Sequence, residues 1–76
     1  MVKIKTVIPG DNYLLTICLE NGSSVTIDLK RKLFTVRFAE LRDKEVFRAA
    51  ATDGETVYWP GGLSLDLSEI MEIAAK

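Results

Sequence analysis

The sequence predicts a small α+β domain. We expect a mostly antiparallel sheet made from two hairpins, in the order β-β-β-α-β-β-α, with the helices packed on one face. Three observations point to this class: short segments in which apolar and polar residues alternate, glycine-containing turns between them, and two stretches with apolar residues at helical spacing. A chain of 76 residues has the length of one domain, so residues 1–76 are interpreted as a single α+β domain.

The first part of the chain predicts three strands joined by tight turns. Val2 to Ile8 begins with alternating apolar and charged residues and ends at a Pro-Gly pair. Tyr13 to Leu19 carries apolar residues on both faces, which is typical of a central strand covered at least partly on both sides. Ser23 to Leu29 alternates again, and we expect it to form a hairpin with the central strand.

The register of this hairpin follows from the pairing that keeps one face apolar. A two-residue turn would place apolar residues beside polar ones. A three-residue loop with Gly22 in the left-handed conformation instead pairs Ile17 with Val25 and Leu15 with Ile27. We therefore predict the bulged three-residue loop rather than the commoner two-residue turn.

The middle of the chain changes from alternation to helical spacing. Asp43 stands where an N-cap is expected, ahead of a short helix that holds Val46 and Phe47. The β-branched pair Thr35-Val36 and this cap interrupt the pattern, so we expect two short helical pieces rather than one long helix. The apolar residues at helical spacing before the cap are Leu29, Leu33, Phe34, Phe38 and Leu41.

The last third predicts a second hairpin followed by a helix. Residues 49–52 and 56–59 flank a glycine turn, and Pro60 ends the second strand because proline cannot donate a ladder hydrogen bond. Gly61-Gly62 then allows the chain to reverse. Asp66 is expected to cap the final helix, with Glu69 at its third position. The apolar stripe of this helix is formed by Leu67, Ile70, Met71 and Ala74.

The residue types that most enzymes and metal sites use are scarce. The chain has no histidine and a single cysteine, Cys18, which lies among apolar neighbours and is interpreted as a core residue. Two carboxylate pairs remain. Asp66 with Glu69 suits a helix start, and Asp53 with Glu55 suits a solvated turn. We therefore predict that the protein is not an enzyme and needs no cofactor or metal.

Several short motifs follow one another in a distinctive order. Those of the second half are Phe38-Ala39-Glu40-Leu41, Asp43 with Val46-Phe47, Asp53-Gly54, Trp59-Pro60 with Gly62, and Leu65-Asp66. The first half adds the hairpin Tyr13 to Leu29, with Asn21-Gly22 at its turn and Val25…Asp28-Leu29 after it. Together these motifs cover nearly the whole chain, and they resemble the bacterial family called domain of unknown function 2442.

The resemblance implies a compact α+β domain from a bacterium or a phage-like element. The family has no assigned activity, so no catalytic residue is carried over. Some of its members look like partners in toxin–antitoxin-like gene pairs, and some carry a helix-turn-helix extension. This sequence ends at Lys76 without such an extension, so we do not expect DNA binding by that route.

The leading hypothesis is a noncatalytic protein-interaction module, including the antitoxin-like or regulatory member of a bacterial gene pair. Its predicted partner-binding residues are Tyr58, Trp59 and Pro60, because tyrosine and tryptophan dominate interface hot spots. Alternation places Tyr58 and Trp59 on opposite faces of their strand, and one of the two is expected to cover the core. The partner is another protein or a second copy, since a small domain rich in apolar residues favours a homodimer or other homo-oligomer.

The alternative is nucleic-acid binding through the basic segment, residues 30–48. The residues expected to contact phosphate are Lys30, Arg31, Lys32 and Arg37. Residues 30–52 carry a net charge of +4 and residues 53–76 one of −4, so the two regions could also pair with each other.

A third hypothesis is a small-molecule sensor or enzyme whose pocket is lined by carboxylates near Trp59, Asp66 and Glu69. No apolar run approaches the length of a membrane span, so we predict no membrane partner. The lone cysteine favours a cytoplasmic location.

Overall fold

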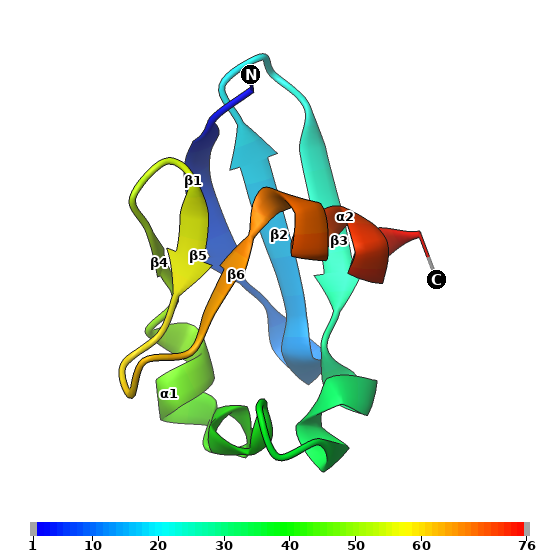
Figure 1. Ribbon diagram of the computed structural model, residues 1–76, viewed down its shortest axis with the longest axis vertical. Coiled ribbons are helices and arrows are strands. Elements are labelled where there is room, and N and C mark those ends of the chain that lie inside the picture. Colours follow the sequence, from blue (N-terminus) through cyan, green and yellow to red (C-terminus); the bar gives the residue numbers. More distant parts are fainter. Residues whose placement is uncertain (1, 76) are drawn as a thin grey trace.

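The protein contains two small antiparallel sheets (Figure 1). The computed structural model describes residues 2–75. In the first sheet, β2 lies between the other two strands, which are β1 (Ile4–Pro9), β2 (Leu14–Leu19) and β3 (Ser24–Asp28). In the second sheet β5 is central, and the strands are β4 (Ala51–Thr52), β5 (Thr56–Tyr58) and β6 (Ser64–Asp66). The predicted α+β class and the antiparallel pairing are confirmed.

Short helical elements connect and follow the sheets. The turn η1 (Asp11–Tyr13) joins β1 to β2, and η2 (Lys30–Phe34), η3 (Ala39–Arg42) and α1 (Lys44–Arg48) join the two sheets. The last element, α2 (Leu67–Ala74), packs against β3. Asp43 and Asp66 cap α1 and α2 as predicted, because their side chains accept hydrogen bonds from the backbone N–H groups of Glu45 and Glu69.

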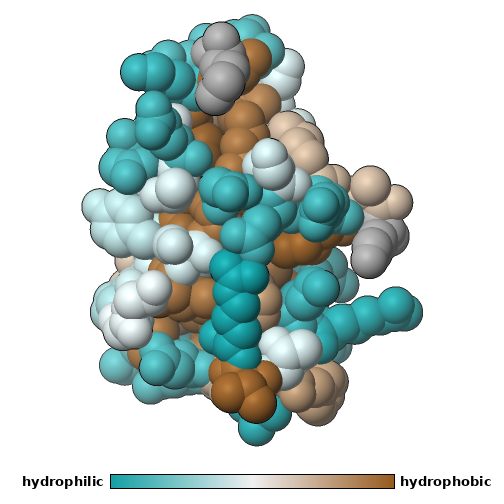
Figure 2. Space-filling view, viewed as in Figure 1, coloured by the Kyte–Doolittle hydropathy of each residue, from teal (hydrophilic) through white to brown (hydrophobic). Residues whose placement is uncertain are grey.

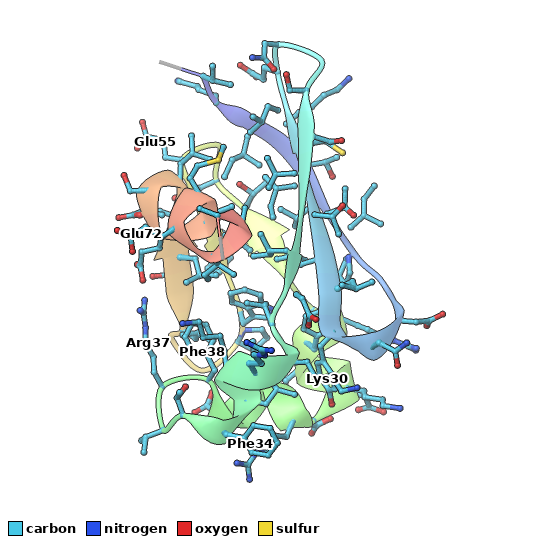
Figure 3. The ribbon with its side chains drawn as sticks, turned by 90° about the vertical axis from the view of Figure 1, so that its right-hand side faces the viewer. Lys30, Phe34, Arg37, Phe38, Glu55 and Glu72 are labelled. Carbon is cyan, nitrogen blue, oxygen red and sulfur yellow. The ribbon has the colours of Figure 1, made fainter. Side chains whose placement is uncertain are left out.

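The two sheets form layers that enclose one core. In Figure 3 the first sheet stands on one side, and the second sheet with α2 stands on the other. The backbone N–H of Ile4 donates to the carbonyl of Gly54 at 2.8 Å, which ties β1 to the turn between β4 and β5. The elements η2, η3 and α1 occupy the lower end of the molecule in Figure 1. The buried side chains form a single cluster: Ile4, Leu15, Ile17, Leu19, Ile27, Leu29, Leu33, Phe38, Leu41, Phe47, Val57, Trp59, Leu63, Leu65 and Ile70.

The first hairpin has the predicted register. Ile17 pairs with Val25 and Leu15 with Ile27, and Gly22 is left-handed with φ of 91°. The N–H of Leu19 bonds the carbonyl of Ser23 at 2.8 Å, which closes the three-residue loop. The parity of apolar residues therefore determines the turn type here.

Replacing Gly22 with alanine is expected to lower the free energy of unfolding by about 1 kcal/mol, because an L side chain is disfavoured in the left-handed conformation. A Cβ at Gly22 would meet no atom within 4 Å, so the cost comes from the backbone alone. Gly10→Ala is the matched control: its φ is −116°, and its Cβ would make only an ordinary contact with the Leu14 carbonyl at 3.5 Å. Urea unfolding followed by circular dichroism measures both variants. Equal stability of the two would contradict the assigned turn.

The second sheet contains a strand, β6, that the predicted order β-β-β-α-β-β-α does not include. Leu63 and Leu65 alternate only briefly in sequence, but Leu65 pairs with Val57 and extends the second hairpin to three strands. The middle segment forms η2, η3 and α1 rather than two helical pieces, and its helices close one end of the core instead of sharing a sheet face with α2. Within residues 2–75, no helix has the length and apolar character needed to cross a membrane.

The outer face of the first sheet carries small and β-branched side chains. Cys18 lies on this face, half-buried, opposite Thr6 and Ser24, so its interpretation as a core residue is wrong. Leu14 is exposed on the same face. The apolar residues on this side of β2 therefore do not indicate a covering layer among the described residues, although the predicted central position of β2 is correct.

Candidate functional site

Trp59 is part of the core. Its side chain is 2% exposed, and its indole N–H donates to the carbonyl of Phe47 at 3.0 Å. The alternation of β5 continues into Trp59, the residue after its end, and explains this placement, because Trp59 lies on the same side as the buried Val57. The prediction that one aromatic residue covers the core is therefore confirmed, and Trp59 offers almost no exposed surface for the predicted partner contact.

Tyr58 and Pro60 remain at the surface. Tyr58 is 44% exposed, and Pro60 begins the turn that leads to β6. Within this turn, Gly61 and Gly62 both adopt positive φ, of 99° and 96°, as the predicted reversal requires. Of the three residues predicted to bind a partner, these two can do so without unfolding the core.

The four basic residues predicted to contact phosphate are spread over several hollows, and Lys32 lines one with Arg31 and another with Arg37. Lys30 and Arg31 are exposed, and Lys32 is half-buried. Lys30 lines a hollow beside α1, whereas Arg31 and Lys32 line a different hollow beside the end of α2. Arg37 forms an ion pair with Glu69. The helix that would place Lys30 and Arg37 on one face is absent, because η2 ends at Phe34.

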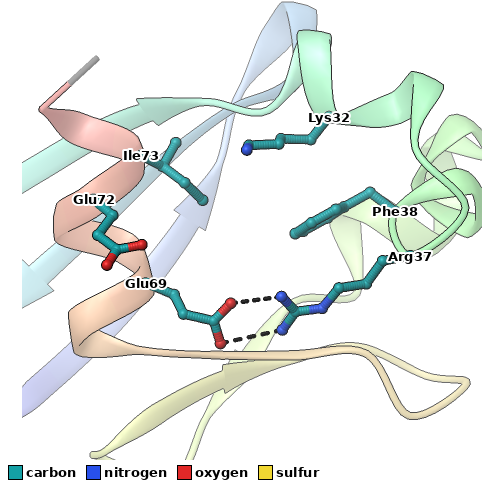
Figure 4. A pocket seen from close by; sticks show the side chains of 6 residues that line it. All are labelled: Lys32, Arg37, Phe38, Glu69, Glu72 and Ile73. Carbon is teal, nitrogen blue, oxygen red and sulfur yellow. Dashed lines mark hydrogen bonds and ion pairs between the residues drawn. The ribbon is translucent and has the colours of Figure 1, made fainter.

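Arg37 forms a two-pronged ion pair with Glu69 of α2 (Figure 4). Its two terminal nitrogens lie 2.5 and 3.1 Å from the carboxylate oxygens, and one of them also donates to the Ser64 carbonyl at 2.8 Å. The guanidinium stands 5.3 Å from the centre of the Phe38 ring. These contacts fasten the segment after η2 to the second sheet and α2. The small hollow beside them, about 90 Å³, is also lined by Lys32, Glu72 and Ile73.

The ion pair shifts both titrating groups. The hydrogen bonds from Arg37 lower the pKa of Glu69, and those to Glu69 raise the pKa of Arg37. The pKa of Glu69 is lower in the folded than in the unfolded state. The contribution of its ion pair to the stability of the fold is therefore complete above the ordinary pKa of glutamate. It is lost as the pH falls through the lowered pKa.

Glu69→Gln is expected to reduce the free energy of unfolding at pH 7 by about 0.5–1 kcal/mol. The effect is small because the side chains of Arg37 and Glu69 are 51% and 35% exposed and water screens the pair. Below the lowered pKa of Glu69 the wild-type carboxylate is protonated, so the two proteins should unfold alike. Urea unfolding across the acid range measures this convergence.

Glu72→Gln, one turn later in α2, is the control and should leave stability unchanged both at pH 7 and in acid. A difference between wild type and Glu69→Gln that persists in acid would contradict the role of charge.

The carboxylates considered for catalysis hold turns and helix starts. Asp53 accepts hydrogen bonds from the backbone N–H groups of Glu55 and Thr56 and from the Thr56 hydroxyl, and these bonds lower its pKa. Asp66 caps α2 and also lines a hollow of about 340 Å³ with Glu55 and Leu67. Within residues 2–75, no group of three or more histidine, cysteine, aspartate or glutamate side chains could hold a metal ion.

The most exposed large apolar side chains lie at the end of η2 and just after it, and neither was predicted to be a site residue. Phe34 is 82% exposed and Val36 is 97% exposed, and we call these two residues the apolar tip. In Figure 3 Phe34 points away from the body at the lower end of the molecule. Figure 2 shows hydrophobic surface at this end, bordered by hydrophilic atoms. Phe34 shares its helical spacing with Leu29, Leu33, Phe38 and Leu41, but those four side chains are buried and Phe34 is not.

The apolar tip is fixed on both sides. Leu33 before it and Phe38 after it are buried in the core. The backbone N–H and the hydroxyl of Thr35, which lies between the two tip residues, both bond the carbonyl of Lys32, at 2.9 and 2.6 Å. Arg42 stands 5.8 Å from the centre of the Phe34 ring. The exposure of the tip is thus a property of a well-anchored turn.

Comparison with known proteins gives no relative: the chain matches no protein-family model, no curated protein and no solved structure. The resemblance to domain of unknown function 2442 therefore remains a prediction.

Proposed function

We propose that this domain is a noncatalytic protein-interaction module that binds its partner through the apolar tip. The observation that carries the proposal is the exposure of Phe34 and Val36, at 82% and 97%. Burying such side chains is worth about 1.5–3 kcal/mol each, and the domain leaves this free energy unused in isolation. Phenylalanine is among the residues enriched in protein interfaces.

The surroundings of the tip indicate the chemistry of the partner. Arg31 and Arg42 are exposed in the same stretch of chain, and Arg42 lies against the Phe34 ring. Arginine and aromatic residues are enriched in protein interfaces, and unlike charges favour association. The proposed partner is a protein with an apolar pocket bordered by carboxylates.

The predicted surface at Tyr58 and Pro60 is a second contact within this proposal. The turn that follows Pro60 faces the segment after the tip, because Gly61 and Gly62 line the same hollow as Arg37 and Glu40, about 310 Å³ in volume. A partner seated on the tip therefore extends toward this turn. A role as the antitoxin-like or regulatory member of a bacterial gene pair, in the cytoplasm, belongs to the same proposal.

Co-expression with the products of the two adjacent genes tests the proposal. We expect one of them to co-elute with the tagged domain in size-exclusion chromatography. A second copy of this chain is the competing occupant, and sedimentation of the isolated domain distinguishes it. A strictly monomeric domain that co-elutes with neither product would count against an interaction module encoded with its partner.

Nucleic-acid binding through residues 30–48 is the second candidate. It is favoured by the exposure of Lys30 and Arg31 and weakened by the engagement of Arg37 with Glu69. This candidate predicts binding that weakens steeply with salt and disappears in Arg31→Glu, measured by fluorescence anisotropy with a labelled oligonucleotide. Binding that is independent of salt would remove it.

A further inference from the structure

A small pocket beside α1 gathers three cationic side chains. It has a volume of about 140 Å³ and lies where the turn η1 meets α1 and the start of η2. Lys30, Lys44 and Arg48 line it, and we call this hollow the cationic pocket. One carboxylate, Asp11, is also part of the lining. The apolar tip shares no residue with this pocket.

The three cations lack partners within the described part of the chain. Between residues 2 and 75 the one ion pair is Arg37 with Glu69, so no carboxylate lies within 4.0 Å of Lys30, Lys44 or Arg48. Lys44 and Arg48 are four residues apart in the five-residue helix α1, where like charges destabilise a helix. The fold therefore tolerates repulsion around this hollow, and an anion would relieve it.

The part of the lining that η1 supplies is held by contacts of Tyr13. Asn12 and Tyr13 have positive φ angles, 57° and 60°, which are uncommon for residues other than glycine and persist only where contacts impose them. Tyr13 supplies those contacts. Its hydroxyl donates to the Arg42 carbonyl at 2.6 Å, and its ring meets the Phe47 ring edge-on at 5.1 Å between centres. At the entry to η2, the Lys30 N–H bonds the Asp28 carboxylate at 2.9 Å.

We propose that the cationic pocket binds the phosphate group of a phosphate monoester. The lining of the pocket favours a dianion, because its three cations outnumber its single carboxylate. The volume argues for one small anionic group, because pockets that enclose whole ligands measure about 300–1,000 Å³. The remainder of the ligand then lies outside the pocket. This site is additional to the proposed protein contact at the apolar tip and does not depend on it.

Isothermal titration with inorganic phosphate tests the site, with sodium chloride at equal ionic strength as the reference. We expect saturable binding that Lys44→Gln and Arg48→Gln each weaken by about tenfold, the loss of one charge-assisted hydrogen bond. Arg31→Gln is the matched control, since Arg31 belongs to the same basic segment but lines another hollow. Circular dichroism confirms that each variant is folded. The proposal is overturned by non-saturable heats, or by equal weakening in Arg31→Gln.

Two further ligands test whether the pocket recognises a phosphate monoester. O-phosphoserine and a 5′-phosphorylated oligonucleotide present a monoester, whereas the same oligonucleotide without its terminal phosphate presents only diesters. We expect the phosphorylated forms to bind and Lys44→Gln to weaken them. Equal binding of both oligonucleotides would overturn the monoester assignment and favour backbone contacts through residues 30–48. Phe34→Ser should bind phosphate like wild type, which separates this site from the apolar tip.

Discussion

Replacing Trp59 with alanine is expected to unfold the domain or nearly so. The substitution removes the largest side chain of the core and leaves the Phe47 carbonyl without its indole donor. Truncation of a buried aromatic residue costs about 3–5 kcal/mol, and a domain this short has little stability to lose. Thermal and urea unfolding by circular dichroism measure the loss.

Two controls separate packing from hydrogen bonding at this position. Trp59→Phe keeps much of the apolar volume but not the N–H donor, so it should cost about 1–3 kcal/mol. Tyr58→Ala, on the exposed face of the same strand, should cost less than about 1 kcal/mol. Wild-type stability in Trp59→Ala would show that the indole does not lie in the core.

The double substitution of Phe34 and Val36 by serine is expected to weaken partner binding by about 100-fold or more, because burying each side chain contributes about 1.5 kcal/mol or more and the two together about 3 kcal/mol or more. The same protein should keep its stability within about 0.5 kcal/mol, since both side chains are exposed. The measurement is a binding titration against the co-eluting gene product, with urea unfolding in parallel.

Tyr58→Ser is the matched surface control for the apolar tip. It removes an exposed aromatic side chain from a different element and should weaken binding less than the double substitution does. Full binding by the Phe34→Ser, Val36→Ser protein, together with loss of binding in Tyr58→Ser, would assign the partner to β5 instead.

Local rules predict the first hairpin and both helix starts. The register around Gly22 follows from parity alone, because only one loop length keeps Ile17 opposite Val25 on an apolar face. The caps at Asp43 and Asp66 depend on hydrogen bonds that reach two or three residues along the chain. These features involve neighbours in sequence, so the sequence contains the information needed to place them.

The candidate site depends on longer-range contacts and on the tighter geometry of η2. Phe34 shares a helical pattern with buried residues, but η2 ends beside it, so only Leu33 turns inward. The pairing of Arg37 with Glu69 joins positions 32 residues apart, which residue spacing cannot predict. The burial of Trp59 could be predicted from the sequence. Its side of the strand also carries Val57, which makes that side more apolar than the side with Thr56 and Tyr58.

Amide hydrogen exchange on the complex with its co-eluting partner tests the central claim most directly. If the apolar tip is the main binding surface, exchange should slow more at the amides of Phe34 to Arg37 than at those of Thr56 to Trp59. Slowing confined to residues 56–59, with the tip exchanging as in the free domain, would contradict the account.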